Sequence, residues 1–566
     1  MEEIQCGNPS APPSQLEPLN PPERIKVSYS KTIIDVLPDE LIGDIIDLVV
    51  SEYLDSMAFG ERMDEEEPFY LWLHSTHVCR RWRQIALQTP KIWRRISITS
   101  KDCVLSMLVR SKNANLQVFA KDWGNKQRRK YADLVCHVLC ARPHRVESVD
   151  LNISPKTYER IRRRLGDTSF TSLRQVRIYS DTDSGSPDIV LANPPLRLRD
   201  SPRLEEIDLC SCVFPMRLLP LSNTTTCIKL QQLHERYANL EFEELLDVLQ
   251  QMPNLKNLIL CYSLKPIDNV PSTLTSVALS KLRLISLQGV TMFTTTTLLH
   301  CLHFPTTCDV EIQLTETLVR GSEDVFARDI ADHFVDTPAT TLEIDFSFSP
   351  EERISFGART ASNRSLAVTA YSEVDAGGGR SMLTSLLSYL PTSKVRTLIL
   401  SDRSHSLLDP ENPPVWWMPL SHQLPNVETL KLDGDSRRLV SALRAPTPTG
   451  YPPLPPTLPP TEPYIHNTPG WLPYRNLRQL DVIMMHVTED IGMGLHETLE
   501  GRRENGLEVL KSVRLYSRYR WPPFEEDSAL LSEATFKSLQ AVVGMDGSVE
   551  CNLFGSDLEC MLPRDD

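Results

Sequence analysis

The stretch Leu255-Lys256-Asn257-Leu258-Ile259-Leu260 shows the apolar pattern that recurs most often in this 566-residue chain. Its apolar residues Leu255, Leu258 and Leu260 are separated first by two residues and then by one. Leu258 and Leu260 lie two residues apart, so an extended chain places them on the same face. The stretch therefore predicts a short strand with one buried face.

The same apolar spacing recurs through most of the chain. Some copies follow a proline with asparagine or arginine, as in Ser201-Pro202-Arg203 and Leu424-Pro425-Asn426. The copies are Val146/Val149/Leu151, Leu173/Val176/Ile178, Leu204/Ile207/Leu209, Leu255/Leu258/Leu260, Leu282/Ile285/Leu287, Val395/Leu398/Leu400, Val427/Leu430/Leu432 and Leu477/Leu480/Val482.

Helical stretches, such as Phe242–Leu249 and Met382–Leu387, lie between these copies. A strand and a helix of this size cannot bury an apolar face alone, so stacked copies predict a curved solenoid with strands on its concave face. Longer intervals would hold degenerate copies, for example Leu342/Ile344/Phe346, or inserted loops. The alternative is a set of unrelated buried strands in an ordinary α/β domain. The pattern resembles irregular leucine-rich repeats, although the usual asparagine is mostly absent.

A different pattern opens the chain. Residues 37–41 read Leu-Pro-Asp-Glu-Leu, and Pro38 suits the first turn of a helix, where a missing N–H costs little. Leu41, Ile45 and Leu48 then recur at helical spacing. Apolar neighbours widen this face beyond that of a lone surface helix, which indicates burial on more than one side.

A second helix is predicted from about Phe69 to Leu87, after an acidic loop at about 55–68. Thr89-Pro90 ends this helix, and 95–98 is predicted to form a short strand.

These elements, in this order, resemble the F-box as it occurs in large fungal families. The resemblance covers about 60 residues, and the acidic loop is longer than in a minimal F-box. It implies that the segment docks a Skp-type adaptor and, through it, a cullin. The residues implied to make this contact are Leu37, Pro38, Leu41, Ile45, Val78, Trp82 and Trp93. The alternative is that they form only the core of a small helical subdomain.

The expected fold class is a small helical F-box followed by an irregular leucine-rich-repeat solenoid of α/β type. The expected divisions are a disordered leader at 1–30, the F-box at 31–98, the repeat domain at 99–545 with a proline-rich loop at 445–465, and a tail at 546–566.

Composition narrows the class of partner. The formal net charge of −14 disfavours nucleic acid and anionic membranes. No apolar run is long enough to span a membrane, and no secretory signal is visible at the N-terminus. The 13 cysteines fit reduced thiols, so the expected location is the cytoplasm, the nucleus or both.

The sequence offers no set of catalytic residues. It lacks the glycine fingerprints of nucleotide sites and the nucleophile elbow of hydrolases. Cys136 and Cys140, and the cluster around Cys301 and Cys308, lack the spacing of zinc sites. We therefore expect no enzyme activity, no metal and no cofactor.

The functional hypothesis is a substrate-recognition subunit of an SCF-type cullin–RING ubiquitin ligase, whose repeats bind an unidentified target protein. The alternative is a non-catalytic interaction scaffold that uses the repeats without ligase assembly.

Overall fold

A computed structural model describes most of the chain between residues 36 and 552. The described residues are 36–59, 71–121, 128–166, 168–180, 201–211, 223–232, 240–267, 275–317, 323–334, 338–349, 351–372, 378–402, 423–434, 474, 476–484, 489–504, 510–517, 531–543 and 547–552. The predicted leader at 1–30 and the proline-rich loop at 445–465 lie outside them.

The chain forms two compact units, Met1–Ile92 and Trp93–Asp566, which are described separately below. The division falls six residues before the end of the predicted F-box segment, so Trp93 and the following strand belong to the second unit.

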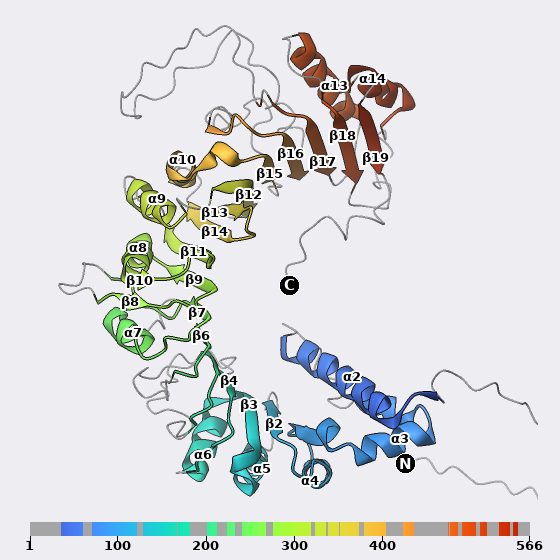
Figure 1. Cartoon of the computed structure of the whole chain (residues 1–566), viewed down its shortest axis with the longest axis vertical. Coiled ribbons are helices and arrows are strands. Elements are labelled where there is room, and N and C mark those ends of the chain that lie inside the picture. The colour runs from blue at the N-terminus through green and yellow to red at the C-terminus, as the bar shows by residue number, and fades with distance from the viewer. Residues whose placement is uncertain are drawn as a thin grey trace, which may run out of the picture. The chain divides into compact units, whose positions relative to one another are not determined.

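In the first unit, helix α2 spans Asp39–Phe59 and opens with the acidic residues Asp39 and Glu40, which favour a helix N-terminus (Figure 1). It continues five residues into the segment predicted as an acidic loop from 55. The reason is visible in the sequence: residues 51–59 contain no glycine or proline, and the first helix-breaking residue is Gly60.

The predicted second helix is divided in two, which corrects the expectation of one helix from Phe69 to Leu87. A 3₁₀-helix, η1, spans Leu71–His77, and α3 spans Arg80–Gln88. Between them Cys79 is extended, with φ −156° and ψ 172°, and this conformation interrupts the helix. Thr89 is extended as well and ends α3 before Pro90, as predicted.

The second unit combines a large, mostly parallel sheet with helices. Its strands are β1 (Arg95–Ser97), β2 (Leu116–Lys121), β3 (Val146–Ile153), β4 (Gln175–Ser180), β5 (Glu206–Cys210), β6 (Cys227–Gln231), β7 (Asn257–Cys261), β8 (Val277–Ala278), β9 (Leu284–Val290), β10 (Leu302–His303), β11 (Asp309–Thr317), β12 (Ala339–Ser349), β13 (Glu351–Thr360), β14 (Ser365–Ser372), β15 (Thr397–Asp402), β16 (Thr429–Gly434), β17 (Gln479–Met484), β18 (Ser512–Ser517) and β19 (Ser548–Asn552).

The α-helices of this unit are α4 (Lys101–Arg110), α5 (Arg128–Ala141), α6 (Pro155–Leu165), α7 (Phe242–Leu249), α8 (Met292–Cys301), α9 (Glu323–Asp332), α10 (Gly378–Tyr389), α13 (Glu489–Glu504) and α14 (Glu533–Val543). Short 3₁₀-helices span Pro90–Arg94 (η2), Pro143–Arg145 (η3) and Thr392–Lys394 (η7). The helices predicted around 242–249 and 382–387 are therefore present as α7 and α10.

Parallel pairing links the strands largely in chain order, from β1 through β7 to β9 and β11, and again from β15 to β19. Figure 1 shows β16 to β19 side by side. The strand β19 continues the sheet into the segment predicted as a tail from 546.

The register aligns the apolar triplets into buried columns. The second position of each triplet is paired with the second position of the next, and the first of these columns runs Val149, Val176, Ile207, Ile228, Leu258 and Ile285. These side chains are at most 1% exposed. A one-residue slip would expose a whole column, so burial fixes the register.

The long interval between Leu282 and Val395 holds an insertion of different topology. Strands β12, β13 and β14 form an antiparallel meander, and its outer strands pair in parallel with β15 and β11. The predicted degenerate copy Leu342/Ile344/Phe346 lies in β12. Arg364, in the turn before β14, is 1% exposed and donates to the carbonyl oxygens of Cys308 and His333, which ties the meander to its neighbours.

Several strands end in the same unusual backbone conformation. The φ angle is positive at Ser211 (55°), Tyr262 (49°) and Gly289 (70°), which occupy equivalent positions at the ends of β5, β7 and β9. Only glycine adopts this left-handed region without strain. The same positive φ angle at the ends of these strands shows that the repeated segments share local backbone geometry as well as apolar spacing.

Candidate partner-binding site

Helix α2 carries apolar residues on two sides. Ile42, Ile46 and Val50 are completely buried and lie four residues apart, so they form the inner side. The other side, here called the outer face, consists of Leu41, Ile45, Leu48 and Val49, with exposed fractions of 48%, 39%, 67% and 40%. Exposed leucine and isoleucine are common singly, but a contiguous group indicates a contact surface.

Ion pairs fix the start of this helix within the first unit. The Arg81 guanidinium on α3 bonds to the Asp39 carboxylate at 2.6 Å and also donates to the carbonyl oxygen of Leu37. Lys91 pairs with Asp44. These exposed pairs contribute little free energy each. The contacts of Arg81 hold residues 37–41 against α3, and Lys91 links α2 to η2.

The remaining predicted contact residues differ in exposure. Pro38 is exposed and Leu37 half-buried, while Val78 is 59% exposed at the break between η1 and α3. Trp82 is half-buried, and its indole N–H makes no hydrogen bond to any described residue.

Trp93 is the one predicted contact residue that is buried. It belongs to the second unit, is 4% exposed, and has the Arg110 guanidinium 4.4 Å from its ring centroid. A cation–π contact of this kind stabilises a packed tryptophan. The structure thus groups Leu37, Pro38, Leu41 and Ile45 on one stretch of the first unit, and Trp93 is counted with the second unit.

Further exposed apolar residues of the first unit were not among the predicted contacts: Val36, Leu48, Val49 and Leu87. The signal for Leu48 and Val49 was the excess width of the apolar face in the sequence. The wide apolar face predicted that α2 is buried on two sides. Among the described residues, only the inner side of α2 is covered.

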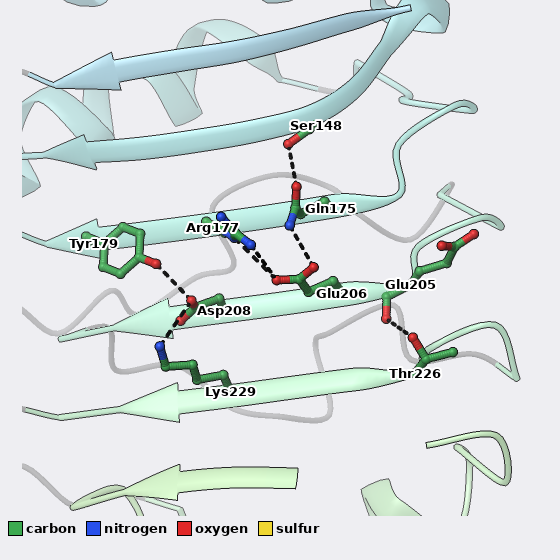
Figure 2. Close-up of polar contacts among 9 residues, drawn as sticks. All are labelled: Ser148, Gln175, Arg177, Tyr179, Glu205, Glu206, Asp208, Thr226 and Lys229. Atoms are coloured by element: carbon green, nitrogen blue, oxygen red, sulfur yellow. Dashed lines mark hydrogen bonds and ion pairs between the residues drawn. The ribbon is translucent and has the colours of Figure 1, made fainter. Parts of the chain in front are cut away.

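A second candidate surface lies on the sheet face opposite the buried columns. The register places Asp150, Arg177, Asp208 and Lys229 in line across β3, β4, β5 and β6, and we call this line the charged column. Figure 2 shows three of these residues, Arg177, Asp208 and Lys229, on neighbouring strands. Strands are spaced about 4.8 Å apart, so these side chains are direct neighbours.

Polar contacts join the charged column to the adjacent residues. Arg177 donates to Oε1 of Glu206 at 3.0 Å, and Gln175 donates to Oε2 of the same carboxylate at 2.6 Å. The Tyr179 hydroxyl donates to Oδ2 of Asp208 at 2.8 Å, and Lys229 lies 3.6 Å from that oxygen (Figure 2). Both cations of the column are therefore engaged by carboxylates on β5.

Asp150 is the remaining carboxylate of the charged column. No described residue forms a hydrogen bond or ion pair with its side chain, because the neighbouring Arg177 turns to Glu206. Desolvation raises the pKa of Asp150 to about 7; Arg177 opposes this rise, whereas the charges of Asp208 and Glu206 add to it. The charged column thus contains a carboxyl group whose pKa lies near neutral pH.

This shift gives a testable pH dependence. The folded state binds the Asp150 proton more tightly than the unfolded chain, where the pKa of aspartate is about 3.9, so this group lowers the free energy of unfolding as pH rises from about 4 to 7. Asp150→Asn should remove that contribution. The thermal midpoints measured at pH 5 and at pH 8 should therefore differ less in the variant than in the wild type. If the two midpoints differ by as much in the variant as in the wild type, the raised pKa of Asp150 is contradicted.

Other chemistry finds little support in the described parts of the chain. No three His, Cys, Asp or Glu side chains there come together in a way that could hold a metal ion. Cys136 is buried, its thiol contacts the carbonyl oxygen of Ile161, and burial raises its pKa to about 11. None of the described helices has the length and apolar character needed to cross a bilayer.

The arginine-rich run of α6 is part of a solvated helix face. Arg162 and Arg163 pair with Glu159, three and four residues earlier, and Arg164 pairs with Asp133 on α5. These contacts account for three of its positive charges within the protein itself.

Comparison with known proteins adds little to this description. No protein-family model matches the sequence, and no curated protein matches it. A solved structure, the crystal structure of the Rad7 and Elc1 complex in yeast, contains a chain that is 12% identical; the match covers 87% of this chain and 93% of that one, with a TM-score of 0.29. A superposition this loose carries no argument about fold or function.

Proposed function

We propose that this chain is the substrate-recognition subunit of an SCF-type cullin–RING ubiquitin ligase. The first unit docks a Skp-type adaptor, and through it a cullin, while the second unit, a leucine-rich-repeat solenoid, holds a target protein. The chain performs no chemistry itself. Its contribution is to hold the target near the transfer site, which raises the effective concentration of the target.

The observation that carries this proposal is the exposed outer face of α2 beside the Leu-Pro-Asp-Glu-Leu stretch at 37–41. Among the described residues, seven of the twelve large apolar side chains that are markedly exposed lie before residue 93, although that unit is much the smaller. A small helical unit that leaves so much apolar surface in water gains stability when a partner covers it. The resemblance of this segment to the F-box supplies the identity of the partner.

The proposal is tested by co-purification of the tagged full-length chain carrying Leu37→Ala and Pro38→Ala. The wild-type chain should retain a Skp-type adaptor and a cullin, and the double variant should lose both. Val109→Ala, which shortens an exposed side chain on α4 of the second unit, is the matched control and should retain them. Equal retention by the double variant and the wild type would remove the docking assignment.

A further inference from the structure

Positive charge is concentrated in one part of the second unit. Residues 101–180, from the start of α4 to the end of β4, contain 17 lysines and arginines against 7 aspartates and glutamates, which is a net charge of +10 in a chain whose net charge is −14. Helices further along are acidic: α7 carries three carboxylates and no lysine or arginine, and α9 carries four carboxylates against one arginine. The charge of the helices therefore changes sign between α6 and α7.

The outer side of α6 holds a dense group of these cations. Lys156, Arg160 and Arg163 follow one another at spacings of four and three residues, so they share one side of the helix, and we call them the basic face. The opposite side packs inward through buried residues that include Tyr158 and Ile161. Lys156 and Arg163 are exposed and Arg160 is half-buried, so the basic face is open to solvent.

The chain itself neutralises this group only in part. Glu159 accepts two hydrogen bonds from Arg162 and one from Arg163, so two guanidinium groups share one carboxylate. Lys156 and Arg160 form no ion pair with any described residue. The next residue along, Arg164, pairs with α5 at a distance of 3.0 Å, and Figure 1 shows α5 and α6 next to each other.

Arg163 is already oriented for a ligand. Its Nε donates to Oε1 of Glu159 at 2.7 Å, which restricts rotation of the guanidinium, while its two terminal nitrogens bind no described residue. The side chain is 74% exposed. The nitrogens of a guanidinium are spaced to hold both oxygens of a carboxylate. A carboxylate that approaches from solvent can therefore bind with little further ordering of Arg163.

We propose that the basic face binds an acidic helix of a partner protein. This inference goes beyond the proposed function and does not depend on ligase assembly. Along the axis of α6, Lys156 lies about 6 Å from Arg160 and about 10 Å from Arg163. Glutamates four and seven residues apart on a partner helix have the same spacing, so each cation can meet one carboxylate.

Nucleic acid fits this surface less well, for two reasons. The tyrosines of α5 and α6, Tyr131 and Tyr158, are 6% and 3% exposed, so neither can stack on a base. The rest of the chain is acidic, so a long polyanion that extends past α6 meets repulsion. A short acidic helix can contact the cations alone.

The test measures binding of three fluorescent ligands to the full-length chain by anisotropy at low salt. The first is an alanine-rich helical peptide with glutamate at positions i, i+4 and i+7, the second has glutamine at these positions, and the third is a short DNA duplex. The glutamate peptide should bind and the glutamine peptide should not, and added salt should weaken binding. Lys156→Gln combined with Arg160→Gln and Arg163→Gln should weaken binding about tenfold, because three exposed ion pairs are lost.

The matched control is Lys256→Gln combined with Lys281→Gln and Arg283→Gln. These three cations are exposed and lie just before β7 and β9, so the control removes the same charge from another place. It should change affinity less than about twofold, because only the long-range field changes. Thermal unfolding of both variants shows whether they fold as the wild type does.

If the triple variant of α6 unfolds at a lower temperature, Lys156→Gln combined with Arg160→Gln replaces it. This double variant breaks no ion pair among the described residues of the free chain, so it should stay folded and still weaken binding.

Equal weakening by the control and by the α6 variant would overturn the inference, because binding would then follow net charge alone. Failure of the glutamate peptide to bind the wild-type chain would overturn it as well, and so would tighter binding of the DNA duplex than of the glutamate peptide. None of these outcomes decides the proposed adaptor docking, because the variants leave the first unit unchanged.

Discussion

Glutamate at both Leu41 and Ile45 is expected to weaken the binding of a Skp-type adaptor strongly while the chain stays folded. The two side chains are 48% and 39% exposed, so the free protein tolerates a charge there with little loss of stability. In the proposed complex the same charges would be buried without partners, which is strongly unfavourable. We expect affinity to fall by about 100-fold, or about 3 kcal/mol.

The measurement is isothermal titration of the purified variant with a purified Skp-type adaptor, together with thermal unfolding of the free chain. Val109→Glu is the matched control: it places the same charge on a side chain that is 77% exposed, but on α4 of the second unit. The control should bind as the wild type does. Wild-type affinity in the Leu41→Glu and Ile45→Glu double variant would show that the outer face of α2 takes no part in binding.

Gly289→Ala is expected to cause a large loss of stability although it adds only one carbon. Gly289 has a φ of +70°, and a Cβ atom there would lie 2.1 Å from Cδ1 of the Tyr262 ring. The strained backbone costs about 1 to 2 kcal/mol, and the overpacked contact adds about 1 to 3 kcal/mol. The chain should therefore lose about 3 kcal/mol of unfolding free energy.

Gly166→Ala separates these two contributions. Gly166 also has a positive φ, +51°, but nothing lies within 4 Å of the added carbon, so only the backbone cost applies. Denaturant unfolding of both variants gives the comparison. Combining Gly289→Ala with Tyr262→Ala should cost less than the sum of the single changes, because the ring is removed. If Gly289→Ala loses no more unfolding free energy than Gly166→Ala, the end of β9 is not packed against the Tyr262 ring at the end of β7 as described.

The strands of the sheet were predictable where every position of the triplet is apolar. Leu255, Leu258 and Leu260 illustrate this: all are completely buried, and the last two lie in the buried columns. Strand β6 was not predicted, because Thr225 occupies the first position of its triplet, two residues before the strand begins. That threonine is completely buried and its hydroxyl lies 3.4 Å from the carbonyl oxygen of Leu204, so a polar residue fills an apolar position.

Other parts of the sheet were missed for different reasons. Leu510, Val513 and Leu515 keep the spacing and precede or form β18, so this signal was present in the sequence. The meander of β12 to β14 was not predictable, because one apolar pattern suits parallel and antiparallel pairing alike. Pairing partners, rather than residue types, decide between the two.

The candidate site was predictable only in part. Spacing alone identifies Leu41 and Ile45 as apolar helix positions, but it cannot tell which apolar side of α2 packs inward. The structure resolves this by burying Ile42 and Ile46. The charged column was beyond the reach of sequence analysis, because Asp150 and Asp208 are far apart in the chain and only the strand register aligns them.

The proposed docking of a Skp-type adaptor to the first unit can be measured in isolation. The most direct test is the equilibrium affinity of the purified full-length chain for a purified Skp-type adaptor, with no other ligase component present. If the first unit docks the adaptor, we expect saturable one-to-one binding with a Kd of about 1 µM or tighter, since a stable complex of standard interface size reaches this range. No saturable binding at adaptor concentrations of about 100 µM would contradict it.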